Sequence, residues 1–409
     1  MRIVTLPEAA HLPKWRQPIV LLALMAIAMP IGFNTWSALL NNFVIEKANF
    51  DGADIGVLHS LREIPGFLAV GVIFLIIFIR EQFLGLASLA LLGIATALTD
   101  YFPYYGGIMT LTVLSSIGFH YYETVNQSLQ LQWLPKDRAP QILGWLLAAG
   151  SAATLVVYFF IMILWEPLGL SFNIVFIAGG GTTVLIAVFC MLAYPQFEGA
   201  HKQNKKMILR RRYWLYYALQ FMAGARRQIF MVFAGFMMVE KFGFEVHEVA
   251  GLYLINLVIN MFAAPYIGQL VARFGERHIL LFEYSGLVCV FLAYAGVYFM
   301  DWSFWVAAGL YVLDHIFFSM ALALKTYFQK IGDPEDMAPT AAVAFTINHI
   351  AAVFLPVGLG LLWLVSPAGV FLLAAAMASV SFCLALLIPR HPVKGHETVF
   401  ANTAAAPAE

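Results

Sequence analysis

Residues 106–140, GGIMTLTVLSSIGFHYYETVNQSLQLQWLPKDRAP, decide the fold because their pattern occurs twice in the chain. This apolar run carries His120 and Glu123 inside it and ends in Pro-x-Asp-x-Ala-Pro, which starts at residue 135. Residues 304–339 form a second apolar run with an adjacent acid and histidine inside it, and the same ending starts at residue 334. Since the two endings lie about half a chain length apart, the sequence predicts a duplicated membrane bundle, a pattern typical of secondary transporters.

The composition excludes a soluble protein. Hydrophobic residues make up 62% of the chain and charged residues only 11%, which is outside the range of soluble domains. In lipid, only helices and closed barrels satisfy all backbone hydrogen bonds, and long apolar runs leave no need for strands. The chain is therefore predicted to be all-α, to lie in a lipid bilayer and to bind no nucleic acid.

Twelve apolar runs are long enough to cross a bilayer, which takes about 20 residues. They predict an all-α membrane protein with twelve transmembrane helices in two pseudo-symmetric six-helix bundles, at residues 18–43, 55–79, 83–99, 106–133, 142–164 and 172–194, then 214–239, 249–271, 279–299, 304–328, 340–364 and 368–388. The predicted parts are an N-terminus at 1–17, a bundle at 18–194, a basic linker at 195–213, a bundle at 214–388 and a disordered tail at 389–409.

The basic residues of the connections predict the orientation. Almost all of them fall on the side of the N-terminus, and only Lys47 and Lys241 fall on the other side. The positive-inside rule then places both termini and the 195–213 linker in the cytoplasm, with the chain in the inner membrane of a bacterial cell. The basic linker is better read as an anchor at the membrane surface than as a nucleic-acid patch.

One connection carries a recognisable motif. Residues 268–277, GQLVARFGER, resemble the signature loop of the major facilitator superfamily, Gly-x-Leu-x-Asp-Arg-x-Gly-Arg-Arg/Lys. Gly268, Arg273, Gly275 and Arg277 match it, whereas Ala272 stands where the family has aspartate. The glycines permit a tight turn between helix ends, and the arginines are expected to bond the last helical carbonyls. With the layout of six spans, a basic linker and six more spans, the whole chain is similar to this family.

The resemblance implies that spans one, four, seven and ten line a central cavity. Placing an arginine at the bilayer centre costs about 2.5–3.5 kcal/mol, so ionisable residues there must face protein or water. We therefore expect one aqueous chamber shared by both halves. Its expected residues are Asn34 on span one, His120, Glu123 and Gln127 on span four, Arg226 and Arg227 on span seven, and Asp314 and His315 on span ten.

His120 and Glu123 lie three residues apart and so share one helix face, which Gln127 continues. A carboxylate beside an imidazole can exchange protons near neutral pH, so His120 and Glu123 are predicted to couple transport to protons, together with Asp314 and Glu63, whereas Gln127 is predicted to contact the substrate. The alternative is interhelical polar contact, worth about 0.6 kcal/mol per bond in membranes.

Arg226 and Arg227 are adjacent and point about 100° apart, so at most one faces the cavity centre. Guanidinium binds carboxylate or phosphate in a bidentate fork, which predicts an anion clamp; two structural ion pairs are the alternative. Span two carries Arg62 and Glu63. One of them is expected to line the cavity and the other to bond toward His349 on span eleven, with pure packing as the alternative.

No enzyme signature, metal site or cofactor site is found. Gly179-Gly180-Gly181 lies inside an apolar run and lacks a following Gly-Lys-Ser/Thr, so it is not a phosphate loop. His247-Glu248 lacks a second histidine four residues on, so it is not a zincin motif.

The sequence therefore predicts a monomeric secondary transporter that works by alternating access. Its substrate is a small polar organic solute, anionic or zwitterionic, moved together with protons. A second hypothesis is an exporter of amphipathic compounds or drugs, because the 15% aromatic content would suit an apolar cavity. A third, from another class, is a non-transporting membrane sensor or scaffold with the same fold, which would show no flux in proteoliposomes.

Overall fold

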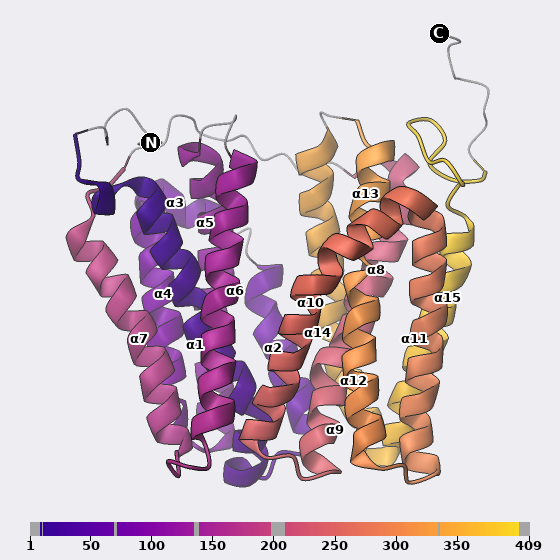
Figure 1. Cartoon of the computed structure of the whole chain (residues 1–409), viewed down its shortest axis with the longest axis horizontal. Helices are drawn as coiled ribbons and strands as arrows, with labels where there is room; N and C mark the ends of the chain where they lie inside the picture. Colours follow the sequence, from indigo (N-terminus) through magenta and orange to yellow (C-terminus); the bar gives the residue numbers. More distant parts are fainter. Residues whose placement is uncertain are drawn as a thin grey trace. The chain divides into compact units, whose positions relative to one another are not determined.

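A computed structural model of the chain describes residue 9 and residues 11–68, 72–134, 139–197, 209–333 and 336–400. These residues are helical nearly throughout (Figure 1), and extended pairing among them is limited to an isolated bridge between Val393 and His396. Most of the first Pro-x-Asp-x-Ala-Pro copy, at 135–138, and the start of the second, at 334–335, lie outside the described residues. So do residues 198–208 of the predicted linker and the two chain ends.

The twelve predicted spans all correspond to helices. The first six are α1 (Pro18–Ala48), α2 (Gly52–Phe67) with α3 (Val72–Phe78), α4 (Glu81–Ala97), α5 (Tyr105–Trp133), α6 (Ala139–Leu164) and α7 (Phe172–Ala193). The last six are α8 (Trp214–Gln228) with a π-helical turn η6 (Ile229–Ala234) and α9 (Gly235–Glu240), α10 (Val246–Phe274), α11 (Glu276–Phe299), α12 (Phe304–Ser319) with α13 (Leu322–Ile331), α14 (Met337–Val365) and α15 (Pro367–Leu386).

Membrane character varies among these spans. Within the described residues, eight helices are long and apolar enough to cross a bilayer, and α4 is a shorter apolar helix. The spans that fall below this level are α2 with α3, α5, and α8 with α9. These three spans carry the predicted site residues Arg62, His120 and Arg226, and two of them, α2 with α3 and α8 with α9, are divided into helices shorter than 18 residues.

The chain forms two compact units of similar size. The first contains Met1–Asn49, Leu61–Gln203 and Phe244–Leu254, and the second contains Phe50–Ser60, Asn204–Gly243 and Ile255–Glu409. Two helices are therefore shared between units: the start of α2 belongs to the second unit, and the start of α10 belongs to the first.

Close backbone contact holds the first unit together where α4 crosses α7. A Cβ atom added at Gly180 would lie 2.4 Å from the carbonyl oxygen of Gly93, and one added at Gly93 would lie 2.6 Å from that of Gly180. The triple glycine of the sequence thus serves helix packing. The same unit has a core of buried side chains that includes Leu89, Tyr122 and Trp133.

In the second unit, α11 packs along α15 (Figure 1) and α8 packs against α14. The start of α2 joins this unit through glycines. A Cβ at Gly56 would lie 2.3 Å from the carbonyl oxygen of Pro356, and one at Gly360 would lie 2.4 Å from that of Gly52. Small residues on both helices allow this approach, as is common in membrane bundles.

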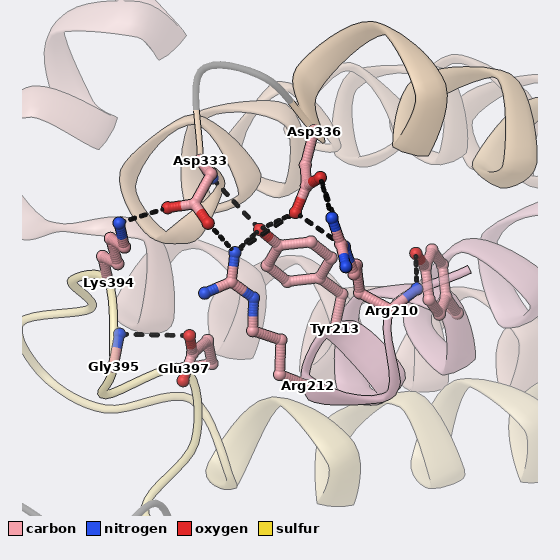
Figure 2. Close-up of polar contacts among 9 residues, drawn as sticks. Arg210, Arg212, Tyr213, Asp333, Asp336, Lys394, Gly395 and Glu397 are labelled. Carbon is pink, nitrogen blue, oxygen red and sulfur yellow. Dashed lines mark hydrogen bonds and ion pairs between the residues drawn. The ribbon is translucent and has the colours of Figure 1, made fainter. Parts of the chain in front are cut away.

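The second Pro-x-Asp-x-Ala-Pro copy contributes a polar cluster to the second unit (Figure 2). Asp336 is only 2% exposed and accepts hydrogen bonds from both Nε and an Nη atom of Arg210, at 3.1–3.2 Å, and from the hydroxyl of Tyr213 at 3.2 Å. Arg212 pairs with Asp336 and with Asp333. These cationic partners, the Arg210 guanidinium above all, lower the pKa of the Asp336 carboxyl.

The prediction that residues 389–409 are disordered is wrong for residues 389–400, which form bonds with the second unit. Lys394 Nζ lies 2.7 Å from Asp333 Oδ1, and the Tyr327 hydroxyl donates to the carbonyl oxygen of Glu397 (Figure 2 shows the Lys394 pair). The backbone N–H of Val399 also bonds to the carbonyl oxygen of Leu387 at 2.9 Å. The Ala/Pro-rich composition of the tail suggested disorder, but ion pairs and backbone bonds hold this segment against its own unit.

Candidate functional site

Arg226 is the centre of a buried charge group in the second unit. Its guanidinium lies 3.6 Å from Glu283 Oε1 on α11 and 4.4 Å from the ring centroid of Tyr284, and its Nε donates to the Met222 carbonyl at 3.3 Å. Arg226 and Glu283 are both buried. In this structure Arg226 therefore takes part in an ion pair, which was the structural alternative to an anion clamp.

Asp314 adds a second carboxylate to this group. Its side chain is 2% exposed, and its Oδ2 atom has no hydrogen-bond partner among the described residues. It interacts electrostatically with Arg226 and with Tyr294. One guanidinium thus stands near two buried carboxylates, so the charges of these three side chains do not balance unless one carboxylate is protonated.

The π-helical turn η6 begins at Ile229, two residues after Arg227. Its Phe230 ring lies 5.0 Å from the Tyr311 ring and 5.7 Å from the His315 ring on α12, measured between centroids. π-Helical turns inside α-helices are frequent at functional sites because they shift the register of the side chains that follow. Here the turn brings the predicted residue His315 beside the helix that carries Arg226.

Two other predicted residues of this unit are Arg227 on α8 and His349 on α14. Arg227 is partly buried on α8. His349 on α14 is buried, its ring lies 4.1 Å from the Phe345 ring, and its Nδ1 is 2.9 Å from the Phe345 carbonyl oxygen. The expected contact of span two with His349 stays a prediction, as does the shared chamber.

Arg62 occupies an aromatic site in the first unit. Its guanidinium carbon lies 5.1 Å from the Phe33 ring centroid and 5.5 Å from that of Trp36, within the range of cation–π attraction. A small cavity of about 10 Å³, enough for about one water molecule, lies here. Three hydroxyls also line it, those of Thr112, Ser115 and Ser116.

Two predicted proton-coupling residues of the first unit, Glu63 and His120, directly follow residues that line this cavity, Arg62 and Phe119. Phe119, another lining residue, is followed by His120, and one ligand atom each of His120 and Glu63 lie within 4.8 Å of one another. Glu63 on α2 and His120 on α5 are both buried. Glu123, one turn further along α5, is partly buried and makes no hydrogen bond or ion pair with any described residue.

Gln127 is exposed on α5. Asn34 bridges α1 to α6: its Nδ2 donates to Thr154 Oγ1 at 2.9 Å, and its Oδ1 accepts from the Tyr158 hydroxyl at 3.0 Å. In this structure its amide is thus engaged in helix contacts.

The signature loop forms the predicted turn. Gly275 has φ +78, and its N–H bonds to the Val271 carbonyl at 2.9 Å, which agrees with the need for glycine. The expected bonds from Arg273 and Arg277 to the last helical carbonyls stay a prediction. His278 Nδ1 lies 2.9 Å from the Phe274 carbonyl oxygen.

The remaining loop residues are spread around this turn. Gly268 lies inside α10, Arg273 is exposed beside the Phe274 ring, and Arg277 is partly buried at the start of α11. Between them, buried Glu276 forms an ion pair with Lys330 at 2.8 Å. This pair ties α11 to α13 although the aspartate of the family motif is missing.

Sequence reasoning missed Glu283 and its neighbour Tyr284. Glu283 is the carboxylate within the predicted span 279–299, and an ionisable residue inside a span indicates function by default. This rule alone was sufficient to include Glu283 among the candidate site residues. The resemblance directed attention to spans one, four, seven and ten, whereas Glu283 lies on span nine.

Comparisons with known proteins agree with this architecture. A sequence model described as Major Facilitator Superfamily matches residues 20–356. The solved structure of the nucleoside transporter NupG, a D323A mutant, is similar with a TM-score of 0.73 and 12% identity, over 90% of this chain and 99% of that one. A bacterial homolog of the human lysosomal transporter Spinster, inward-facing and occupied, gives a TM-score of 0.69 and 13% identity, over 90% and 95%. No curated protein sequence matches.

Proposed function

The chain belongs to the Major Facilitator Superfamily, and from this premise we propose that it moves a small polar organic solute, anionic or zwitterionic, across the membrane together with protons. Membership of a transporter family points to transport rather than to enzymatic catalysis. Alternating access, in which the substrate site opens to one side of the membrane at a time, is the mechanism that we propose.

The observation that carries the proposal is the buried group of Arg226, Glu283 and Asp314. A guanidinium that is buried beside two carboxylates can exchange one partner for a substrate anion, while the released carboxylate takes up a proton. Such an exchange would couple the two species without leaving an unpaired charge in the membrane. A purely apolar cavity, as an exporter of amphipathic drugs would need, does not require these groups.

We assign roles to the other predicted site residues from the chemistry of their side chains. Arg227, His315 and His349 in the second unit, and Arg62, Asn34 and Gln127 in the first, are proposed to contact the solute. Protons are proposed to bind Asp314 in the second unit, and Glu63, His120 and Glu123 in the first. We propose that the protein acts as a monomer in a bacterial inner membrane, with both termini in the cytoplasm.

A ligand screen on the purified protein tests this proposal. Organic anions, zwitterions and nucleosides are added singly, and the midpoint of thermal unfolding is measured, because a ligand that binds the folded form raises it. A solute that raises the midpoint is then tested for uptake into proteoliposomes with an inward proton gradient. We expect Arg226→Ala and Arg227→Ala to weaken binding at least about tenfold, which corresponds to about 1.4 kcal/mol.

Two results would contradict the proposal. One is binding and flux of the solute that survive the double replacement of both arginines. The other is a solute that is moved equally well with and without a proton gradient. Arg273→Ala, which changes an exposed arginine of the signature loop, serves as the control for loss of a positive charge.

A further inference from the structure

Three potential metal ligands converge in the first unit, away from the proposed transport residues. Glu166 lies in the connection between α6 and α7, and Glu245 and His247 lie at the start of α10. One ligand atom from each of the three side chains lies within 4.8 Å of the others. His247 Nδ1 is 3.5 Å from Glu245 Oε2, and His247 Nε2 is 4.0 Å from Glu166 Oε1.

Apart from these two glutamates, no described residue pairs with the His247 imidazole. Its Nδ1 atom is shielded from solvent and makes no hydrogen bond with any described residue. The two glutamates are 64% and 61% exposed, and the histidine is 24% exposed. The group is therefore open to ions from solution, whereas its nitrogen ligand is held largely inside the protein.

The backbone around these ligands is held firmly. The Glu245 N–H donates to the Glu248 carboxylate at 2.9 Å, which caps the start of α10. One residue earlier, the Phe244 carbonyl accepts a 2.6 Å hydrogen bond from the buried amide of Asn42 on α1. Further along α10, the Tyr253 ring lies 5.4 Å from the Tyr158 ring on α6. Two of the three ligands thus stand on a helix start that is fixed to its neighbours.

We propose that Glu166, Glu245 and His247 bind a divalent transition-metal ion such as Zn²⁺. Zinc takes imidazole nitrogen and carboxylate oxygen at about 2.0–2.2 Å, so ligand atoms around it stand about 3.3 Å apart, and small side-chain rotations reach this spacing. The mixed nitrogen and oxygen set favours such an ion over Mg²⁺ and Ca²⁺, which prefer oxygen ligands. The sequence did not suggest the site because its third ligand lies some eighty residues from the other two.

Bound metal would join the α6–α7 connection to the start of α10. Most of α10 belongs to the second unit, whereas its start belongs to the first. Since alternating access requires elements to change contacts, a metal that fixes the start of α10 within the first unit slows transport. This consequence rests on the proposed function, but the metal site itself does not.

Titration of the purified full-length protein with ZnCl₂, followed by calorimetry, tests the site directly. We expect saturable binding of one ion per chain, with affinity reduced at least about tenfold in His247→Ala and in Glu166→Gln. His278→Ala is the matched control, since His278 also lies in the first turn of a helix but is exposed and outside the proposed site.

Unchanged zinc affinity in both His247→Ala and Glu166→Gln overturns the proposal, as does absence of saturable binding to the unaltered protein. Circular dichroism and the unfolding midpoint confirm that the variants are folded. A second arm measures solute flux with and without ZnCl₂: inhibition that His247→Ala abolishes supports the link to transport. Zinc binding without an effect on flux upholds the site and rejects that link. If no solute is transported, the proposed function fails, whereas calorimetry still decides the metal site.

Discussion

Among single residues, Arg226 and Glu283 show most directly how a buried charge is retained in a membrane protein. Each is buried, and at a separation of 3.6 Å the attraction between their charges offsets part of the hydration that both lose. Breaking a buried pair by removing one partner typically costs about 3–5 kcal/mol, whereas removing both charges costs much less. The pair is therefore a stability element as well as a candidate transport element, and mutagenesis can separate the two.

We expect Glu283→Gln to destabilise the second unit by about 3 kcal/mol, because Arg226 is left with Asp314 as its remaining carboxylate. The variant Arg226→Met/Glu283→Met should recover much of this loss, since neither charge remains. Thermal unfolding in detergent measures both effects, and the single variants Arg226→Met and Glu283→Met complete the double-mutant cycle. Additive losses in the double variant would show that the two side chains do not interact.

Asp336 leads to a prediction about acid stability. The pKa of its carboxyl is lowered, first by the Arg210 guanidinium, so the charged form is favoured in the folded protein. The stabilising contribution is present above the unfolded pKa of about 3.9 and is lost as the pH falls through the lower folded pKa. The pKa of Asp333 is lowered in the same direction, first by Lys394 and then by Arg212.

We therefore expect Asp336→Asn to lower the unfolding midpoint at pH 7 and to reduce its further fall between about pH 4 and pH 2.5. Asp301→Asn is the control, because Asp301 is exposed and its ion-pair partner within the described part of the chain is Lys241. A midpoint that depends on pH identically in Asp336→Asn and in the unaltered protein would contradict the assignment.

The sequence was sufficient to find candidate site residues, but not the residues that they contact. An acid or arginine inside an apolar run is visible in the printed sequence, which is how Arg226 and Asp314 were found. The rotation of each helix about its axis is set by packing with distant segments, so the pairing of Arg226 with Glu283 has no local signal. For the same reason, the contacts of Asn34 with α6 became visible only in the structure.

At the scale of helices, adjacent glycines have opposite roles in α7. A Cβ at Gly180 would lie 2.4 Å from the Gly93 carbonyl oxygen, whereas a Cβ at Gly181 would meet nothing within 4 Å. Backbone atoms cannot move aside as the end of a flexible side chain can, so only one of the two positions should tolerate a methyl group.

Gly180→Ala should lower the stability of the first unit by about 1–3 kcal/mol, the usual cost of overpacking. Gly181→Ala should leave stability unchanged or slightly raised, since alanine has the higher helix propensity. The difference between the two unfolding midpoints is the measurement. Equal midpoints would mean that α4 and α7 do not approach as closely as described.

The breaks within spans could not be predicted from periodicity. Span seven appears in the sequence as one apolar run, yet in the structure it is α8, the π-helical turn η6 and α9. A π-helical turn contains no proline or glycine signal and depends on tertiary packing, here of Phe230 against α12. Helix existence was predictable for all twelve spans because length and apolarity are local properties, whereas helix interruptions depend on neighbouring helices.

For the whole molecule, coupling between solute and proton is the property that the proposed mechanism must explain. A carboxylate that exchanges protons can be replaced by its amide, which keeps the shape but stays neutral. We expect Glu123→Gln and Asp314→Asn to lose proton-driven accumulation while retaining exchange of solute across proteoliposome membranes. Uptake driven by a proton gradient at an undiminished rate in either variant would remove that residue from the coupling pathway.

The sharing of α2 and α10 between the two units has a consequence for dissecting the chain. A fragment that ends at Gln203 retains Phe50–Ser60 without Pro356 and Gly360, and it lacks the Phe244 carbonyl that Asn42 binds. The complementary fragment, from residue 204 onward, contains Pro356, Gly360 and the Phe244 carbonyl but lacks their partners on α1 and α2. Neither piece can complete its own fold, so fragment complementation should succeed only when both are synthesised in the same cell, and either half made alone should be degraded.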